Sequence, residues 1–390
     1  MIVAIILFWI SVAALVHTYL LYPALIDLLA RRRVAGRNTY ESARDLPGVS
    51  VLMAVHNEEN VISEKIESII LNKHPEEKLE ILVGSDASTD NTDKILQNLA
   101  SSYKYLRFFR FDERRGKSGI INDLVRLSKE DILIITDANV ILEQDTIYHL
   151  LKHFKDTSIG LVDSNMKHKG IRDSGISVQE NLYITREVKI KERESILWGT
   201  MMGPFGGCYA LRRELYCDVP SSFLVDDFFI NMKVIASAHK AIIETDAIVY
   251  EDVSSSLSEE FRRKARIAAG NFQNLKYFSS FLLSSARGVS LSFISHKVLR
   301  WIGPFFFATI FFTSLFLGRE YFFYRYLFYF QVFILILPLV DYLLGKIKIH
   351  VIILRFVTHF ISMNFALLVG FINYLKGVKS NVWQPTRRNQ

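Results

Sequence analysis

The sequence predicts an α/β fold, a Rossmann-like domain with a mostly parallel sheet, flanked by transmembrane α-helices. Two observations predict this fold class. Half of the 390 residues are hydrophobic, and they gather at the two ends of the chain. From Pro47 the pattern changes to short apolar runs that alternate with helical periodicity, which indicates parallel strands joined by covering helices. The length suffices for one such domain together with several membrane helices.

The first apolar segment predicts an N-terminal membrane anchor over residues 1–30. Residues 1–26 carry no Asp, Glu, Lys or Arg. At about 1.5 Å per residue, a helix of this length crosses a hydrocarbon core of about 30 Å. Arg31–Arg33 follow directly, and no small-residue cleavage site is evident. We therefore expect a retained anchor in the plasma (inner) membrane, with the following domain in the cytosol.

Three more apolar blocks predict about three membrane helices within residues 299–376. They are Trp301–Leu317, Tyr321–Val340 and Phe356–Leu375, and aromatic residues crowd their ends. One anchor and three further spans would leave the C-terminus outside, whereas the basic residues of the tail, 377–390, favour the inside. The sequence leaves open whether one block is re-entrant or interfacial, or whether another span exists.

The segment between the α/β domain, expected over 47–272, and the C-terminal spans allows two interpretations. Residues 273–298 mix aromatic, apolar and basic side chains. This composition is typical of interfacial helices on a membrane surface, but it also fits an ordinary linker helix.

Charge and cysteine content exclude several classes of protein. The formal charge is +7, but Arg31–Arg33 adjoin an apolar segment, and no nucleic-acid-binding motif has its required spacing. Nucleic acid is therefore not expected as a partner. Cys208 and Cys217 form no Cys-x-x-Cys pair, so we expect neither a disulfide framework nor a zinc site.

Polar residues follow the predicted strands at the edge where a parallel sheet binds ligands. His56, Asn57 and Glu58 follow the first strand, and Asp86 and Asp137 each directly follow an apolar run. A lone Asp in such a place is usually a helix cap or turn former, but several on one edge favour a ligand site. The strands are predicted at Val49–Val55, Leu79–Gly84, Leu106–Phe109 and Ile132–Thr136, and the helices at Glu58–Leu71, Thr89–Ala100 and Lys117–Leu127.

The chemistry of this edge suits a metal-bound diphosphate. Carboxylates prefer a hard cation such as Mg²⁺ or Mn²⁺, which stabilises a departing diphosphate without a proton. Arg114-Arg115-Gly116-Lys117 opens the third helix, and a helix N-terminus with adjacent cations binds phosphate well. Taken alone, this segment would equally fit a solvated basic turn.

In their order along the chain, these segments resemble the family-2 glycosyltransferases, in the branch of membrane-integrated polysaccharide synthases and lipid glycosyltransferases. The resemblance covers approximately Pro47–Asn274 and implies the type A glycosyltransferase fold. Asp137-Ala138-Asn139 resembles the metal-binding Asp-x-Asp element, with Asn139 in place of the second Asp. The donor-binding residues that the resemblance implies are His56, Asn57, Glu58, Asp86, Lys117 and Asn122.

Two later segments resemble the acceptor side and the catalytic element of that family. Gly206–Arg213 resembles the acceptor-side segment, and Val225-Asp226-Asp227 resembles a Thr-Glu-Asp element. The match implies that Asp227 is the catalytic base, with Asp226 beside it. Adjacent carboxylates raise each other's proton affinity, which suits a base. Without the other motifs, the pair would better fit a cap on the helix expected at Phe228–Ile235.

A basic segment occupies the place of the Gln-x-x-Arg-Trp element of processive members. Here Arg263-x-x-Arg266-Ile267 stands instead. The resemblance implies that Arg263 and Arg266 bind the donor diphosphate, while the missing Gln and Trp weigh against binding of a growing chain. Anionic lipid headgroups are the alternative ligand of these arginines.

The resemblance implies an inverting transferase that moves a sugar from a nucleotide-sugar, expected to be a UDP-sugar, to a membrane-associated lipid or glycan acceptor. Mg²⁺ or Mn²⁺ is the expected cofactor, and accessory membrane proteins are allowed for as partners. A processive polysaccharide synthase is the close alternative. A transporter with a regulatory domain and a membrane nucleotidyl- or phosphotransferase also stay open, although charged groups in the spans and a glycine-rich phosphate loop are scarce or missing.

Overall fold

The computed structural model describes all residues except 34–35, 37, 171–175, 253–255, 285–287 and 379–390. The chain divides into two compact units. A helical unit comprises Met1–Leu28, Arg172–Glu180 and Ser254–Gly377. An α/β unit comprises Leu29–Ile171, Asn181–Val253 and Val378–Gln390.

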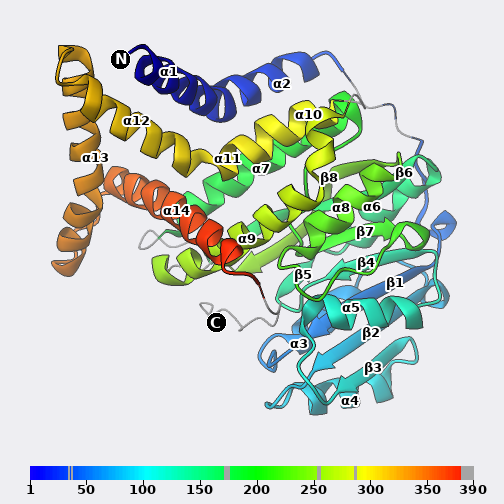
Figure 1. Ribbon diagram of the computed structural model, residues 1–390. Coiled ribbons are helices and arrows are strands. Elements are labelled where there is room, and N and C mark those ends of the chain that lie inside the picture. The colour runs from blue at the N-terminus through cyan, green and yellow to red at the C-terminus, as the bar shows by residue number, and fades with distance from the viewer. Residues whose placement is uncertain (34–35, 37, 171–175, 253–255, 285–287, 379–390) are drawn as a thin grey trace. The chain divides into compact units, whose positions relative to one another are not determined.

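The α/β unit is built on a mixed sheet with eight strands among the described residues, in the order β3-β2-β1-β4-β7-β6-β8-β5 (Figure 1). β3, β2, β1 and β4 run parallel, and so do β6 and β8. β7 is antiparallel to β4 and β6, and β5 is antiparallel to β8. The strands are β1 Val49–Val55, β2 Leu79–Asp86, β3 Leu106–Phe111, β4 Ile132–Thr136, β5 Val140–Leu142, β6 Ile159–Lys169, β7 Cys208–Arg212 and β8 Lys240–Asp252.

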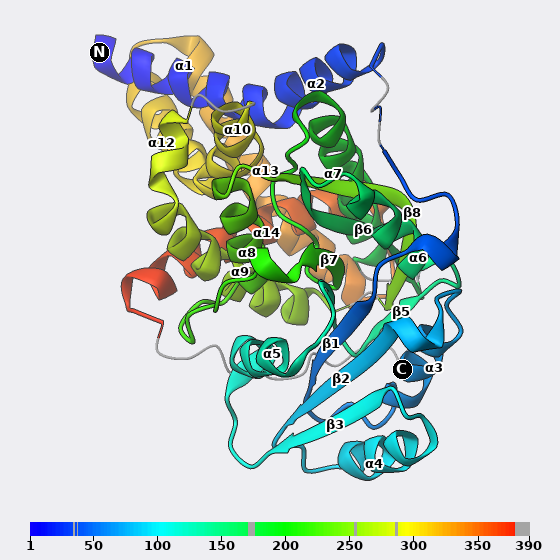
Figure 2. The same ribbon diagram turned by 90° about the vertical axis from the view of Figure 1, so that its right-hand side faces the viewer.

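Helices connect and cover these strands. α5 packs on β1 and β2, and α4 packs on β3 (Figure 2). The predicted α/β class with a mostly parallel sheet is confirmed, and the antiparallel β5 and β7 are additions to it. The helices are α3 Ile62–Ile70, α4 Thr92–Ser102, α5 Gly116–Leu127, α6 Thr146–Leu151, α8 Asp226–Ala236 and α7 Ser177–Trp198, most of which belongs to this unit.

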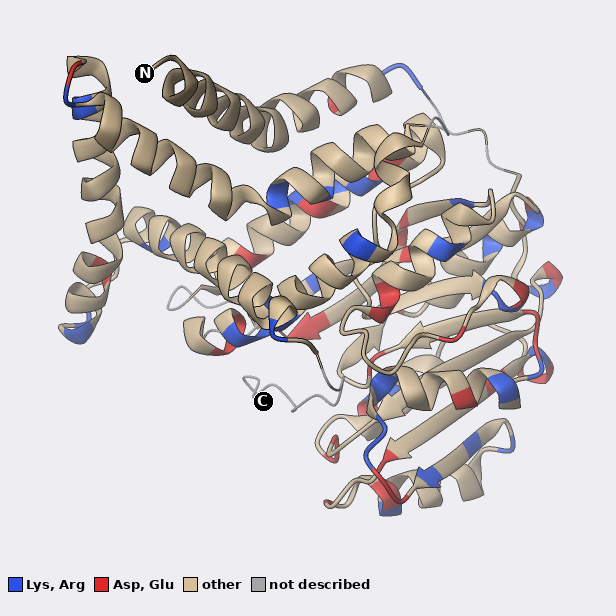
Figure 3. Ribbon diagram, viewed as in Figure 1, with Lys and Arg blue, Asp and Glu red and all other residues tan. Residues whose placement is uncertain are grey.

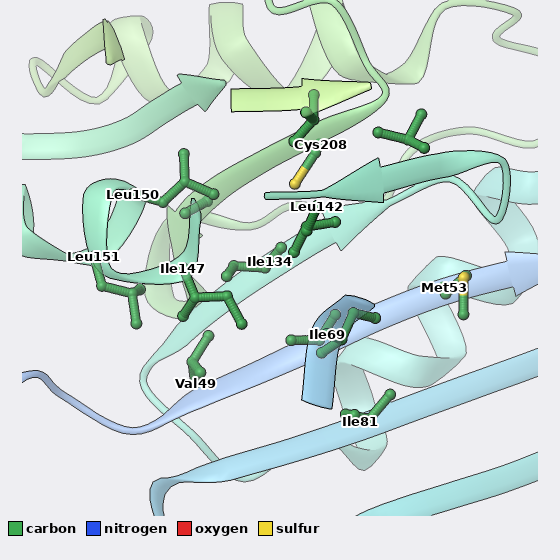
Figure 4. Close-up of a cluster of buried hydrophobic side chains, with 14 of the residues drawn as sticks. Val49, Met53, Ile69, Ile81, Ile134, Leu142, Ile147, Leu150, Leu151 and Cys208 are labelled. Carbon is green, nitrogen blue, oxygen red and sulfur yellow. The ribbon is translucent and has the colours of Figure 1, made fainter. Parts of the chain in front are cut away.

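The core of this unit lies between the sheet and the helices α3 and α6. Val49 and Ile134 point from the strands toward Ile69 of α3 and toward Leu150 and Leu151 of α6 (Figure 4). All seven residues of β1 are buried, as are all eight of β2. Strands covered on both faces read as continuous apolar runs, which is why these strands could be predicted from sequence.

The predicted strands Val49–Val55 and Ile132–Thr136 match β1 and β4, whereas two predicted helices start too early. α3 begins at Ile62 rather than at Glu58, and α4 begins at Thr92 rather than at Thr89. The backbone N–H of Glu58 donates to Thr92 Oγ1 at 2.9 Å, and that of Glu59 donates to Asp90 Oδ2 at 3.2 Å. Because these contacts join the two loops, both segments remain turns before their helices begin.

The helical unit contains three helices, in the part of the chain described, that are long and apolar enough to cross a membrane. They are Ile2–Ala30, Phe322–Lys346 and Ile352–Leu375. Charged side chains are sparse on these three helices and frequent on the α/β unit (Figure 3). The elements are α1 Ile2–Val16, α2 Tyr22–Ala30, α9 Leu257–Tyr277, α10 Val289–Ser292, α11 Leu299–Trp301, α12 Gly303–Leu317, α13 Phe322–Lys346 and α14 Ile352–Leu375.

The first predicted C-terminal span, Trp301–Leu317, contains a sharp bend near its start. α12 is a helix of 15 residues, and Val289–Trp301 precedes it at an angle of 59°. Together they make a broken span or a re-entrant loop, which is one of the arrangements that the sequence had left open. Pro304 directly after Gly303 explains the break, because proline starts a helix readily but does not continue one.

α9 belongs to the helical unit, whereas the sequence analysis counted residues up to 272 with the α/β domain. Gly370 of α14 lies so close to α9 that a Cβ there would stand 2.3 Å from Ala268 Cβ. Phe272 of α9 packs edge-to-face on Phe371 at a centroid distance of 4.9 Å. Small residues therefore let these two helices approach closely, as in membrane helix pairs.

Candidate active site

The loops that follow β1 and β2 are bonded to each other. Asn57 and Ala87 both have positive φ angles, of 55° and 54°. The Asn57 Oδ1 accepts a hydrogen bond from the backbone N–H of Thr89 at 2.8 Å. Asn57 tolerates this conformation because its short polar side chain bonds locally. The side chain of Asn57 therefore bonds the loop after β1 to the loop after β2 at this edge of the sheet.

Asp86 is a buried carboxylate surrounded by donors. Its oxygens accept from Arg114 Nε at 3.0 Å, from the Arg115 backbone N–H at 2.6 Å and from the Gly116 backbone N–H at 3.1 Å. His56 lies at 2.8 Å from the Asp86 carbonyl oxygen and at 2.6 Å from Arg114 Nη1. Burial, followed by the Arg114 charge, lowers the pKa of His56. The five residues thus form one polar network that fixes the start of α5.

Lys117 lies among the acidic residues of the site. Its Nζ is 2.7 Å from Asp137 Oδ1, 3.9 Å from Asp226 Oδ2 and 3.4 Å from the Gly206 carbonyl oxygen. Burial lowers the pKa of Lys117, but Asp137 and Asp226 outweigh it and hold that pKa above its ordinary value. Lys117 therefore stays protonated across the physiological range. This contact unites residues from α5, β4 and α8 that lie far apart in the sequence.

Asp227 occupies the first turn of α8, next to Asp226. Its Oδ1 accepts from the Phe228 backbone N–H at 2.7 Å. Burial, followed by the Asp226 charge, raises the pKa of Asp227 well above its ordinary value. A carboxyl group with a raised pKa takes up a proton more readily, which is the property of a general base near neutral pH.

A glycine loop lies directly against Asp227. Gly206 has a φ of +81°, and a Cβ there would stand 2.4 Å from Asp227 Oδ2. Only glycine meets both requirements. The loop is held from below by Asp163, which accepts from the Phe205 backbone N–H at 3.3 Å and from the buried Lys191 Nζ at 3.2 Å. These contacts hold the loop in place beside Asp227.

Asp137 and Asn139 offer oxygen ligands suited to a hard divalent cation. Asp137 is partly exposed, and its backbone N–H donates to the Gly207 carbonyl oxygen at 2.9 Å. The Asn139 Nδ2 donates to Glu251 Oε1 at 3.2 Å, which leaves Oδ1 as its acceptor. Within the described ranges no group of three or more His, Cys, Asp or Glu side chains forms a self-contained metal site. A cation here would need oxygens from the donor diphosphate or from water, as Mg²⁺ sites usually do.

The other predicted donor-binding residues lie elsewhere. Asn122 Oδ1 accepts from Tyr216 Oη at 2.5 Å, and both ends of its amide bond to Val219, at 3.1 Å each. Arg263 makes two hydrogen bonds of 3.0 Å with Glu260. Arg263 and Arg266 both belong to α9 in the helical unit. Their contact with a donor, like that of Glu58, stays a prediction.

The sequence analysis missed Lys65, Glu251 and the Asp163–Lys191 pair. Lys65 lies on the apolar face of α3 among Ile62, Ile66 and Ile69, and it is fully buried. A charged residue at a core position of an amphipathic helix is a signal that the sequence did contain. Glu251 gave no comparable signal, because its contact with Asn139 depends on the pairing of β5 with β8.

Comparison with known proteins agrees with this geometry. Residues 50–219 match the family model described as glycosyl transferase family 2. The poly-beta-1,6-N-acetyl-D-glucosamine synthase of Staphylococcus aureus is 22% identical over 273 residues, which cover 66% of this chain and 65% of that protein. The probable glycosyltransferase YdaM of Bacillus subtilis is 24% identical over 62% of this chain and 59% of its own length. The alignments thus span less than two thirds of these relatives.

A solved structure resembles nearly the whole chain. It is the mannosyltransferase PcManGT from Pyrobaculum calidifontis, described in complex with GDP-Man and Mn²⁺. The TM-score is 0.71 with 21% sequence identity, over 95% of this chain and 99% of that one. At this identity the likeness shows a shared fold.

The α/β sheet with its acidic strand ends, together with the matched family model and the likeness to PcManGT, shows a type A-like glycosyltransferase fold. Residues 50–219, within the α/β unit, match the glycosyl transferase family 2 model, and the chain is similar to a polysaccharide synthase.

Proposed function

We propose that this protein is an inverting glycosyltransferase that moves a sugar from a nucleotide-sugar, most simply a UDP-sugar, to a lipid or glycan acceptor at a membrane. The observation that carries the proposal is the Lys117 cluster. One ammonium group lies 2.7 Å from Asp137 and 3.9 Å from Asp226, and Asp227 is next to Asp226. A cation for the leaving group and a base for the acceptor thus come together at one edge of the sheet.

In the proposed reaction Asp227 takes the proton from an acceptor hydroxyl. The acceptor oxygen forms a bond to the anomeric carbon of the donor, and the bond from that carbon to the diphosphate breaks. Lys117 stabilises the negative charge that develops on the departing diphosphate. Gly206 lets the loop approach Asp227 closely, since any side chain there would collide with that carboxylate.

Asp137 and Asn139 would hold a divalent cation, Mg²⁺ or Mn²⁺. When bound, the cation supplies further charge stabilisation to the diphosphate without a proton. The related fold that is described with GDP-Man and Mn²⁺ supports this assignment. His56 and Asp86, joined to Arg114 at the start of α5, are proposed to recognise the nucleoside end of the donor.

The test is transfer from labelled UDP-sugars and GDP-sugars by membranes that contain the full chain, with and without Mn²⁺. Sugar transfer that depends on Asp227 and Asp137 supports the proposal. Transfer of phosphate or a nucleotidyl group, or transport without transfer, would contradict it. A preference for GDP-sugars would retain the reaction but correct the donor.

A processive polysaccharide synthase is the second candidate, and the name of the Staphylococcus aureus relative favours it. Against it stand the missing Gln and Trp at Arg263-x-x-Arg266-Ile267 and the pairing of Arg263 with Glu260. Chromatography of the labelled product separates the two, because a synthase yields a ladder of lengths and a single-step transferase yields one added sugar.

We further propose that the helical unit anchors the protein in the plasma membrane with the α/β unit in the cytosol. Arg31–Arg33 after the first apolar helix support this orientation. A cytosolic site would have direct access to nucleotide-sugars, and accessory membrane proteins could receive the product.

A further inference from the structure

Lys65 is a buried cation that the proposed reaction does not use. It lies in the middle of α3 on the face formed by Ile62, Ile66 and Ile69, and its exposed fraction is 0%. Burying an ammonium group costs several kcal/mol unless it is well bonded. Burial accordingly lowers the pKa of Lys65 to about 8. An apolar residue would fill this position at lower cost, so the charge requires an explanation.

The hydrogen bonds of Lys65 identify what the charge holds. Its Nζ donates to Thr136 Oγ1 at 2.8 Å and also to the Val140 carbonyl oxygen. Thr136 is the last residue of β4, and Val140 is the first residue of β5. Between them lie only Asp137, Ala138 and Asn139. One ammonium group therefore closes both ends of the turn that carries the proposed metal ligands.

The same group reaches the glycine loop through Thr136. The Thr136 Oγ1 lies 2.9 Å from the Gly207 carbonyl oxygen, which also accepts from the Asp137 backbone N–H at 2.9 Å. Lys65, the β4–β5 turn and the loop beside Asp227 thus form one hydrogen-bonded network beneath the site. A network of this kind fixes the positions of groups that bind a ligand from above.

We propose that Lys65 is a positioning residue that holds the Asp137–Asn139 turn in the geometry needed to bind a divalent cation together with the donor diphosphate. The proposal rests on the metal site proposed above. In this proposal Lys65 itself touches neither the cation nor the diphosphate. Its role is to bond Thr136 and Val140, so that Asp137 and Asn139 present their oxygens from a rigid turn.

The first experiment compares Lys65→Met with the unchanged full chain, purified in detergent. Methionine keeps the length of the side chain but removes the charge and the hydrogen bonds. Binding of UDP and of GDP is titrated calorimetrically with and without MnCl₂. We expect Mn²⁺-dependent binding to weaken by about 10-fold or more, as for other residues that orient metal ligands. The Mn²⁺ concentration for half-maximal activity should rise in parallel.

A control separates positioning from a general loss of stability. Glu244→Gln disrupts another buried ion pair, that of Glu244 with Lys152, at 3.2 Å. The partners of Glu244 include Lys152, His153 and the backbone of Asp246, which lie outside the proposed site. We expect it to lower the melting temperature at least as much as Lys65→Met, with unchanged Mn²⁺-dependent nucleotide binding. Equal loss of binding in both variants would overturn the positioning role.

A second pair of variants keeps the inference testable should Lys65→Met fold poorly. Thr136→Val removes one acceptor of Lys65 without changing side-chain shape, whereas Thr136→Ser retains it. We expect Thr136→Val to weaken Mn²⁺-dependent nucleotide binding, whereas Thr136→Ser should retain most of it. In the double variant Lys65→Met/Thr136→Val the losses should be less than additive, because both changes break one network. Full additivity would contradict a shared role.

Asp137→Ala distinguishes the two proposals. Loss of Mn²⁺-dependent binding in Asp137→Ala together with normal binding in Lys65→Met would overturn the role of Lys65 and leave the metal site standing. Normal binding in Asp137→Ala would overturn the metal site itself.

Discussion

Asp227 is the residue on which the proposed chemistry depends. Its position in the first turn of α8 alone would fit a helix cap, and it does accept the Phe228 N–H. What distinguishes it is its surroundings, because burial and the Asp226 charge raise its pKa. Replacement by Asn keeps the shape and the hydrogen bond but removes the proton acceptor.

We therefore expect Asp227→Asn to retain donor binding and to lose transfer by on the order of 10²–10⁴-fold. Donor binding by calorimetry and transfer from labelled nucleotide-sugar are the two measurements. Asp218→Asn, at an exposed carboxylate that pairs with Arg126, serves as the matched control and should transfer normally. Near-normal transfer by Asp227→Asn would remove Asp227 from the role of base.

The pH profile should follow from the same shift. A base must be deprotonated to act, and a raised pKa keeps the proton on Asp227 to higher pH. Transfer should accordingly rise with pH through a value well above 3.8, the ordinary pKa of an aspartate. The measurement is kcat/KM of the full chain as a function of pH. If kcat/KM stays constant down to pH 4–5, Asp227 does not titrate with a raised pKa.

The Gly206 position gives a conformational prediction. Alanine at a φ of +81° costs about 1–2 kcal/mol in strain, and its Cβ would stand 2.4 Å from Asp227 Oδ2. We expect Gly206→Ala to reduce transfer strongly while donor binding changes little. Gly345→Ala is the control, since no atom lies within 4 Å of the added carbon and transfer should be unaffected. Equal activity of the two variants would show that the close approach is unimportant.

At the scale of elements, the β4–β5 turn is the central segment of the candidate site. β4 ends at Thr136, and β5 is a short strand paired with β8, where Glu251 accepts from Asn139. A helix behind the sheet, α3, bonds both ends of the turn through Lys65. The turn is thus bonded to β8 through Asn139 and to α3 through Lys65, which holds it in place.

The contact of α9 with α14 is the corresponding element-scale feature of the helical unit. A Cβ at Gly370 would stand 2.3 Å from Ala268 Cβ and 2.6 Å from the Ala265 carbonyl oxygen. Gly370→Val should therefore force these helices apart and lower the melting temperature of the detergent-solubilised protein by several degrees. Gly345→Val, in open space, is the comparison, and equal melting temperatures would argue against close packing.

Charge supports the same helix contact. Glu180, which is buried, lies 3.2 Å from Lys264 Nζ of α9 and 2.7 Å from His359 Nε2 of α14. Burial raises the pKa of Glu180, but Lys264, His359 and Arg263 outweigh it and hold that pKa below its ordinary value. Buried charges that are paired in this way fix one arrangement of helices. Arg263 takes part in this group, which explains why its predicted donor contact is the least supported.

For the whole molecule, orientation in the membrane is the property that decides where sugar transfer occurs. In a Cys217→Ser background, which leaves only the buried Cys208, we expect Arg319→Cys, between α12 and α13, to react with an impermeant maleimide on intact cells. Lys94→Cys on α4 should react only after permeabilisation. The reverse pattern would place the α/β unit outside.

The sequence by itself determined much of the sheet and the nature of the site. Doubly covered strands such as β1 and β4 read as apolar runs, and the residues that follow them in the chain had to meet at one edge. Asp86 and Asp137 could be found in this way, whereas the pair Asp226–Asp227 was implied only by the resemblance to a Thr-Glu-Asp element. Local patterns of apolar, turn-forming and charged residues suffice for such predictions, because each strand and the turn after it depend mainly on residues that are close in sequence.

Only the tertiary structure decided which of these residues meet and what supports them. Lys117 reaches Asp137 and Asp226 because α5, β4 and α8 converge, and Asn122 bonds to Val219 for the same long-range reason. The broken helix before α12 and the ion pairs of Arg263 also depend on packing between distant segments. Contacts across such sequence separations leave no periodic trace in the chain, so the bonds of Lys65 to both ends of the β4–β5 turn became visible only in the fold.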